Sequence, residues 1–119
     1  MLRIVLHLPV PGDPHPPSRE CACCGERYPV KRRGMRLFSG GTLVGEICPE
    51  CVLAGPAGAA GKVRGLMAAR GGDPGAEGMG EDPSAWESRM EERARLLEAT
   101  SSFSLAARQA AVRETRERR

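Results

Sequence analysis

The chain has 119 residues with a formal net charge of +3, and it contains 15 glycines, 10 prolines and only 4 aromatic residues. This length predicts one modest domain with appendages. The shortage of bulky apolar residues predicts a small core that needs stabilisation beyond hydrophobic packing. The longest apolar run is far below the roughly 18 residues of a transmembrane helix, which argues against a membrane protein. The N-terminal apolar stretch is also too short for a secretory signal, so we expect a cytoplasmic protein.

The N-terminal part divides into an apolar segment and a proline-rich segment. Residues 1–8 predict a strand with Leu2, Ile4 and Leu6 on one face. Such a strand pairs either within the chain or with the sheet edge of another protein. Residues 9–18 contain five prolines and predict a semi-extended linker.

Five cysteines dominate the central part of the sequence. Cys21 and Cys24 form one Cys-x-x-Cys pair, and Cys48 and Cys51 form a second. Two such pairs are the ligand set of a tetrahedral Zn²⁺ site, because each pair turns both thiolates toward one ion. Cys23 is the spare thiol and an alternative ligand in place of a neighbour. The odd number of cysteines argues against a disulfide framework.

The region from residue 19 to 55 resembles the four-cysteine zinc ribbons and the treble-clef zinc fingers. The resemblance depends on the motifs Cys21-x-x-Cys24-Gly25 and Cys48-Pro49-Glu50-Cys51. It implies a small, metal-stapled α+β fold in which a β-hairpin module carries structural zinc. These superfamilies include subunits of transcription, translation and recombination machinery, along with many purely structural modules.

The resemblance does not extend to a catalytic group. Treble-clef nucleases of the His-Asn-His kind carry catalytic histidines between or after the two cysteine pairs. Here both histidines, His7 and His15, precede Cys21. Four cysteines also complete the coordination of zinc and leave no position for an activated water. We therefore expect no enzymatic activity and no catalytic residues.

A hairpin is predicted between the two cysteine pairs. Strands near residues 35–39 and 42–47 flank the dipeptide Gly40-Gly41, which favours a tight turn. The second strand would deliver Cys48 to the metal. The apolar residues of the two strands would form a small core beside the zinc, namely Leu37, Phe38, Leu43, Val44 and Ile47.

A cluster of cations occupies the first half of this hairpin region. Arginine suits bidentate contacts to phosphate, and a tyrosine among the cations would stack on an unpaired base. The alternatives are a solvated loop whose charges offset the thiolates and a contact to an acidic protein. The candidate nucleic-acid-binding residues are Arg27, Tyr28, Lys31, Arg32, Arg33 and Arg36.

After the second cysteine pair, the composition changes to alanine and glycine. Residues 56–70 predict a helix over 57–70 with Pro56 at its first position, although three internal glycines leave a flexible tether as the alternative. A helix so soon after the second pair favours a treble clef over a plain ribbon. Residues 71–82 are rich in glycine and acids and predict a linker.

The C-terminal segment, residues 83–119, predicts amphipathic helices. Trp86, Met90 and Leu97 fall on one stripe of a first helix, and hydroxyl residues at 100–102 predict a break before a second helix over 103–117. The stripe either folds back on the zinc module or docks on a partner, including a second copy of the chain. Trp86, Met90 and Leu97 are therefore the candidate partner-binding residues.

These patterns predict a non-enzymatic zinc protein. It would contact nucleic acid through the basic loop and dock on a larger complex through the C-terminal helix. The alternative is a zinc-stabilised protein-interaction adaptor, or a small structural subunit, without direct nucleic-acid contact.

Overall fold

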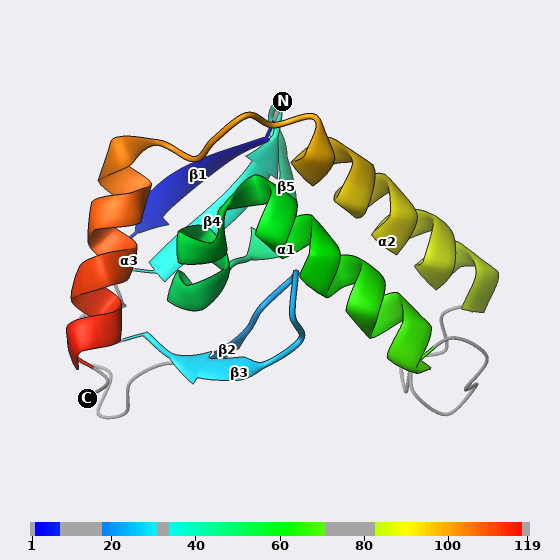
Figure 1. Cartoon of the computed structure of the whole chain (residues 1–119), viewed down its shortest axis with the longest axis horizontal. Helices are drawn as coiled ribbons and strands as arrows, with labels where there is room; N and C mark the ends of the chain where they lie inside the picture. Colours follow the sequence, from blue (N-terminus) through cyan, green and yellow to red (C-terminus); the bar gives the residue numbers. More distant parts are fainter. Residues whose placement is uncertain (1, 8–17, 31–33, 71–82, 118–119) are drawn as a thin grey trace.

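A three-stranded antiparallel sheet lies at the centre of the computed structural model (Figure 1). Its strand order is β1-β4-β5, with β1 at Leu2–His7, β4 at Gly34–Ser39 and β5 at Thr42–Glu46. The structure describes residues 2–7, 18–30, 34–70 and 83–117. The fold is a small α+β arrangement, as the sequence predicts.

The N-terminal strand finds its partner within the chain. β1 pairs with β4 along its whole length, from Leu2 opposite Ser39 to His7 opposite Gly34. β4 and β5 form the predicted hairpin, and Gly40 in its turn has φ 61°, a conformation that glycine adopts without strain. The pairing of β1 within the chain and the position of the hairpin are therefore confirmed.

The two faces of the sheet differ in what covers them. Met35 and Leu37 point to the helices and are 1% and 0% exposed. Because side chains alternate along a strand, Phe38 must point to the other face, and a register shift between Leu37 and Phe38 pairs it with Leu43. Leu43 is 53% exposed. The prediction that Phe38 and Leu43 belong to the core beside the metal is therefore wrong, whereas Leu37 and Ile47 are buried there.

A second, two-stranded sheet was not predicted. β2 (Ser18–Glu20) pairs antiparallel with β3 (Arg27–Pro29), so the predicted linker over 9–18 ends before Ser18. The rest of that linker lies outside the described residues. Strands of three residues are too short to show an alternating pattern, so no hydrophobic periodicity predicts them.

Helix α1 (Pro49–Arg70) starts earlier than the sequence predicts. It kinks at Gly55, where φ is 81° and ψ is 170°, and its second part begins at Pro56. Proline supplies no amide hydrogen and disfavours helical geometry in the preceding residue, so the kink falls at this point. The predicted helix with Pro56 at its first position is confirmed, and the extra turn at the second cysteine pair was missed. The predicted linker over 71–82 lies outside the described residues.

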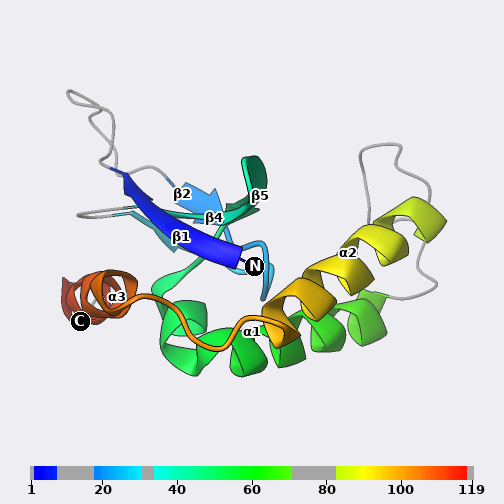
Figure 2. The same ribbon diagram turned by 90° about the horizontal axis from the view of Figure 1, so that it is seen from above.

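Helices α2 (Pro83–Glu98) and α3 (Leu105–Glu117) complete the described fold, and α1 packs against both. All three helices lie on one side of the three-stranded sheet (Figure 2). The predicted break between the last two helices is confirmed. α3 begins at residue 105 because the Ser104 hydroxyl accepts a hydrogen bond from the Ala107 amide at 3.2 Å and caps the helix.

Candidate metal centre

Four cysteine side chains from the two Cys-x-x-Cys pairs meet at one point. The sulfur atoms of Cys21, Cys24, Cys48 and Cys51 all lie within 4.8 Å of one another and could hold a metal ion. The Cys21 and Cys51 sulfurs are 3.6 Å apart, and those of Cys24 and Cys48 are 3.8 Å apart. A tetrahedral site with zinc–sulfur bonds of about 2.3 Å places its sulfurs about 3.8 Å apart. The spacing and the donor set therefore fit a tetrahedral thiolate site.

Each cysteine pair is positioned by a short turn. The first pair lies in the connection between β2 and β3, where the Cys21 amide donates to the Glu26 carbonyl at 2.9 Å. Gly25 closes this turn with φ 75°, in the left-handed region that favours glycine. In the second pair, Cys48 follows β5, and Cys51 lies in the first turn of α1. The metal centre thus joins the small sheet, the large sheet and the start of the longest helix.

Backbone amides stabilise negative charge on the first ligand. The amides of Cys23 and Cys48 each donate to the Cys21 sulfur at 3.4 Å. Hydrogen bonds from Cys23, then from Cys48 and Cys51, hold the pKa of the Cys21 thiol far below its ordinary value. The same hydrogen bonds to Cys21 raise the pKa values of the Cys48 and Cys51 thiols, so negative charge in the metal-free cluster is concentrated on the Cys21 sulfur.

Cys23 is the remaining cysteine, and it is not one of the four clustered ligands. Its side chain is fully buried. The hydrogen bond to Cys21, together with burial, raises the pKa of the Cys23 thiol above its ordinary value. Because the Cys23 sulfur is outside the cluster of four, the alternative use of Cys23 as a ligand does not agree with the geometry.

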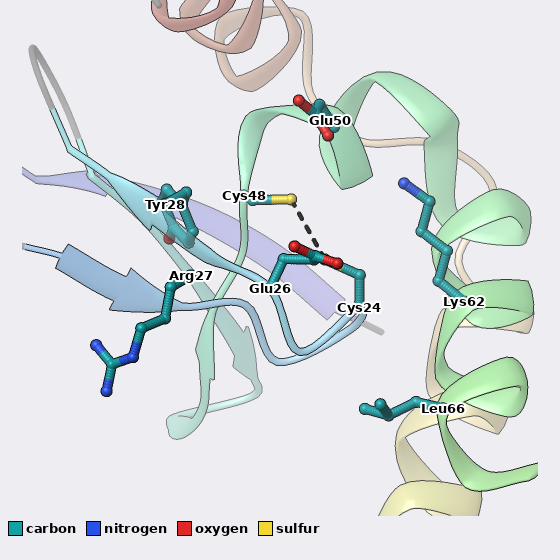
Figure 3. Close-up of a pocket in the computed structure, with 8 residues that line it drawn as sticks. All are labelled: Cys24, Glu26, Arg27, Tyr28, Cys48, Glu50, Lys62 and Leu66. Carbon is teal, nitrogen blue, oxygen red and sulfur yellow. Dashed lines mark hydrogen bonds between the residues drawn. The ribbon is translucent and has the colours of Figure 1, made fainter. Parts of the chain in front are cut away.

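A cavity of about 490 Å³ opens beside the centre (Figure 3). Lys62 and Leu66 line its α1 side, while Arg27 and Tyr28 line its β3 side. Partial burial opposes the charge on Lys62, but the thiolates of Cys51, Cys48 and Cys24 outweigh it and hold the Lys62 pKa above its usual value. Four thiolates around a divalent ion carry a net charge of about −2, which Lys62 partly offsets.

The structure separates the candidate nucleic-acid-binding residues. Arg27 is exposed on β3, and Arg36 on β4 lies with its Nε 3.2 Å from Oε1 of Glu46. Tyr28 is only 3% exposed, and its hydroxyl donates to the Ile47 carbonyl at 3.1 Å. Tyr28 is therefore a core residue that braces the metal centre, and its predicted role in stacking is wrong. Lys31, Arg32 and Arg33 lie outside the described residues.

The short strand that carries Tyr28 has one face in the core. Tyr28 and Val30 are both buried, at 3% and 2% exposure, whereas Pro29 between them is half-buried. This alternation is the period of a strand with one face in the core.

The candidate partner-binding stripe is covered within the chain. Met90 and Leu97 are 2% and 0% exposed, and Trp86 is half-buried against the same core. α2 packs along α1, so this stripe folds back and does not present an open row of apolar side chains. The helix pair also carries an ion-pair cluster that the sequence did not reveal, in which Arg64 binds Glu91 at 2.8 Å and Glu98 at 2.7 Å.

Comparisons with known proteins add no family assignment. No family model matches the chain, and neither a curated protein nor a solved structure matches it. Among the described helices, none has the length and apolar character needed to cross a membrane.

Proposed function

We propose that this protein is a non-enzymatic zinc protein that contacts nucleic acid through the cations near its metal centre. The observation that carries the proposal is the closed set of four cysteine sulfurs within 4.8 Å of one another. A sphere filled by four thiolates is typical of structural zinc, because it leaves no position for a reacting water.

The choice of zinc rests on the donor set. Sulfur-only tetrahedral sites select zinc or iron–sulfur chemistry over magnesium, calcium and manganese, which prefer oxygen ligands. The test is elemental analysis of freshly purified, reduced protein, in which we expect one zinc per chain. Spectra that show iron–sulfur absorption would contradict the assignment.

The nucleic-acid contact rests on the elements that carry the cations. Arg27 lies on β3 and Arg36 on β4, and residues 31–33, Lys-Arg-Arg, connect these two strands in the sequence. Both ends of the connection are held, because Val30 and Gly34 are buried. Arg27 lines the cavity beside the cysteine cluster, and a cation on a rigid element loses little freedom when it binds phosphate, which supports a phosphate-contacting surface.

The experiment is a binding titration of zinc-loaded protein with labelled single-stranded and duplex oligonucleotides at about 50 and 200 mM salt. We expect affinity to fall steeply with salt, and the double variant Arg32→Glu/Arg33→Glu to weaken binding to both forms. Arg108→Glu/Arg113→Glu, the same double charge reversal at exposed positions of α3, is the matched control and leaves binding nearly unchanged. Absence of binding by the wild type at low salt would contradict nucleic-acid contact.

One observation favours a second candidate, docking on a protein partner. α3 exposes Leu105 at 61% and Val112 at 39%, and these residues are two turns apart on one side of the helix. In this alternative, the C-terminal segment still docks a complex, but through α3 in place of the stripe on α2. Sedimentation of the full chain tests self-association through this face, and Leu105→Ser should abolish any dimer.

A further inference from the structure

The outer face of the three-stranded sheet combines an aromatic ring with cations. Residues paired across antiparallel strands share a face, so the pairing of Arg3 with Phe38 and of Phe38 with Leu43 defines one row. In the next row, Val5 pairs with Arg36. Helices α1, α2 and α3 lie on the opposite side of the sheet (Figure 2). α2 reaches the β5 end of the first row, where Leu43 lines a cavity of about 410 Å³ with Arg93 and Leu96 of α2. Arg3 and Phe38 do not line this cavity.

Phe38 is the central residue of this surface. It is half-buried, yet it is neither in the core cluster nor among the side chains that pack against that cluster. Its neighbours Leu43 and Val5 are 53% and 38% exposed. Phe38 therefore lies outside the core, beside two exposed apolar side chains on the outer face.

Two arginines flank Phe38 on the same face. Arg3 is exposed and lies directly opposite Phe38, while Arg36 precedes it by two residues on β4. Glu46 holds the Nε atom of Arg36 at 3.2 Å, and the Arg36 side chain is still 42% exposed. Within the described part of the chain, no other nitrogen of Arg36 is engaged, so the end of its guanidinium faces outward with donors to offer.

We propose that this sheet face binds single-stranded nucleic acid, with a base stacked on Phe38 and the adjacent phosphates contacted by Arg3 and Arg36. The proposal rests on the proposed function and names the form of nucleic acid and the residues that hold it. Stacking on a side chain requires a base whose face is open, and a duplex hides the faces of its bases. Three β-strands about 4.8 Å apart form a platform about 10 Å wide. This width accommodates one extended single strand of nucleic acid.

The position of the basic segment agrees with this path. Residues 31–33 directly precede Gly34, which begins β4 opposite His7 at one end of the sheet. A nucleic-acid strand that crosses Phe38 and runs past Arg36 therefore continues toward Gly34, the first residue of β4. The two aromatic residues exchange their predicted roles, because Tyr28 braces the core and Phe38 lies on the surface.

The test measures fluorescence anisotropy of a labelled oligothymidine and of a duplex of equal length with the zinc-loaded full chain. Phe38→Leu keeps an apolar side chain but removes the ring, and we expect single-strand affinity to fall roughly 5- to 100-fold. Phe38→Tyr keeps the ring and restores wild-type affinity. Arg3→Glu reverses the charge opposite Phe38 and weakens binding several-fold, whereas the control Arg108→Glu does not.

The outcomes separate this proposal from the broader one. Suppose that Phe38→Leu and Arg3→Glu bind like the wild type while Arg32→Glu/Arg33→Glu binds weakly. Binding at the sheet face is then refuted, and the broader proposal of nucleic-acid contact stands. If the wild type binds neither oligonucleotide at low salt, both proposals are refuted. Zinc content and circular dichroism confirm folding of each variant. Should Phe38→Leu fail to fold, the exposed Arg3→Glu decides the result.

Discussion

The cysteine centre and the α1–α2 pair are stabilised by different physical means. Around the metal centre, the turns are held by four sulfur ligands, by amide donors to the Cys21 sulfur and by the Tyr28 hydroxyl. Between the helices, the contact is apolar burial, with Met90, Ala94 and Leu97 almost fully buried. A chain with few aromatic residues thus gathers four sulfurs that could hold an ion where its strands are short, and it relies on apolar packing where its helices are long.

The two regions are joined through one helix. The first turn of α1 contributes Cys51 to the metal centre. More than two turns after the kink, α1 contributes the fully buried Val63 to the core. Gly55 separates these parts. Loss of the metal should therefore disturb the strands and the first turn of α1 more than the helix pair.

The largest expected effect comes from removing a ligand. Cys51→Ser takes away one of four sulfurs, and we expect loss of stoichiometric zinc and of the roughly 10–16 kcal/mol that structural zinc contributes. Hydrogen exchange should report opening of β2, β3 and the cysteine turns before the α1–α2 contact. Cys23→Ser changes a buried cysteine outside the ligand set and should retain zinc. If Cys51→Ser kept zinc and Cys23→Ser lost it, the ligand assignment would be contradicted.

The second effect is a loss of stability in the helical region without loss of the metal. Leu97→Ala removes a fully buried side chain, and we expect a loss of about 2–5 kcal/mol in the free energy of unfolding. Zinc content should remain one per chain. Leu105→Ala, at a 61% exposed position, is the control and should change stability by less than about 0.5 kcal/mol. A zinc-free Leu97→Ala protein would show that the two regions are a single unit.

A smaller effect concerns the tyrosine beside the metal. Tyr28→Phe removes the hydrogen bond to the Ile47 carbonyl and should cost about 1 kcal/mol in urea unfolding. Burial, followed by the negative charges of Glu46 and the thiolates, raises the pKa of Tyr28 far above its ordinary value. Since Tyr28 is the only tyrosine, tyrosinate absorbance should appear only as the protein unfolds in alkali. Titration of the folded protein near pH 10 would contradict this burial.

The smallest effect concerns the ion pairs between α1 and α2. Hydrogen bonds from Arg64 hold the pKa values of Glu91 and Glu98 below their usual range. Their contribution is therefore present above the unfolded pKa of about 4.3 and is lost as pH falls through the lower folded values. These groups are exposed to solvent, so the contribution is small and screened by salt.

Arg64→Met should lower the urea midpoint slightly at neutral pH, and the difference from wild type should disappear in acid and at high salt. Acid also protonates thiolates and releases the metal, so the comparison is made between the two proteins at each pH. A difference that persists in acid would assign the effect to packing of the Arg64 side chain.

Several elements follow from local sequence patterns. The Cys-x-x-Cys spacing, the Gly40-Gly41 turn, Pro56 at a helix start and the stripe through Met90 and Leu97 each depend on neighbours within a few residues. Each local signal predicts its element because it expresses a backbone preference or a periodicity. β2 and β3 escaped prediction, since three residues carry no period.

The sequence by itself determined the ligand set and the main helices and strands, because cysteine spacing and hydrophobic periodicity act over short distances. Only the tertiary structure decided which side of each element is covered. The helices cover the face of β4 that carries Met35 and Leu37, which leaves Phe38 on the other face. The Tyr28 hydroxyl bonds the Ile47 carbonyl, and α1 packs against α2, whose apolar stripe is buried. Burial depends on which distant segments meet, and no local pattern in a single chain specifies that.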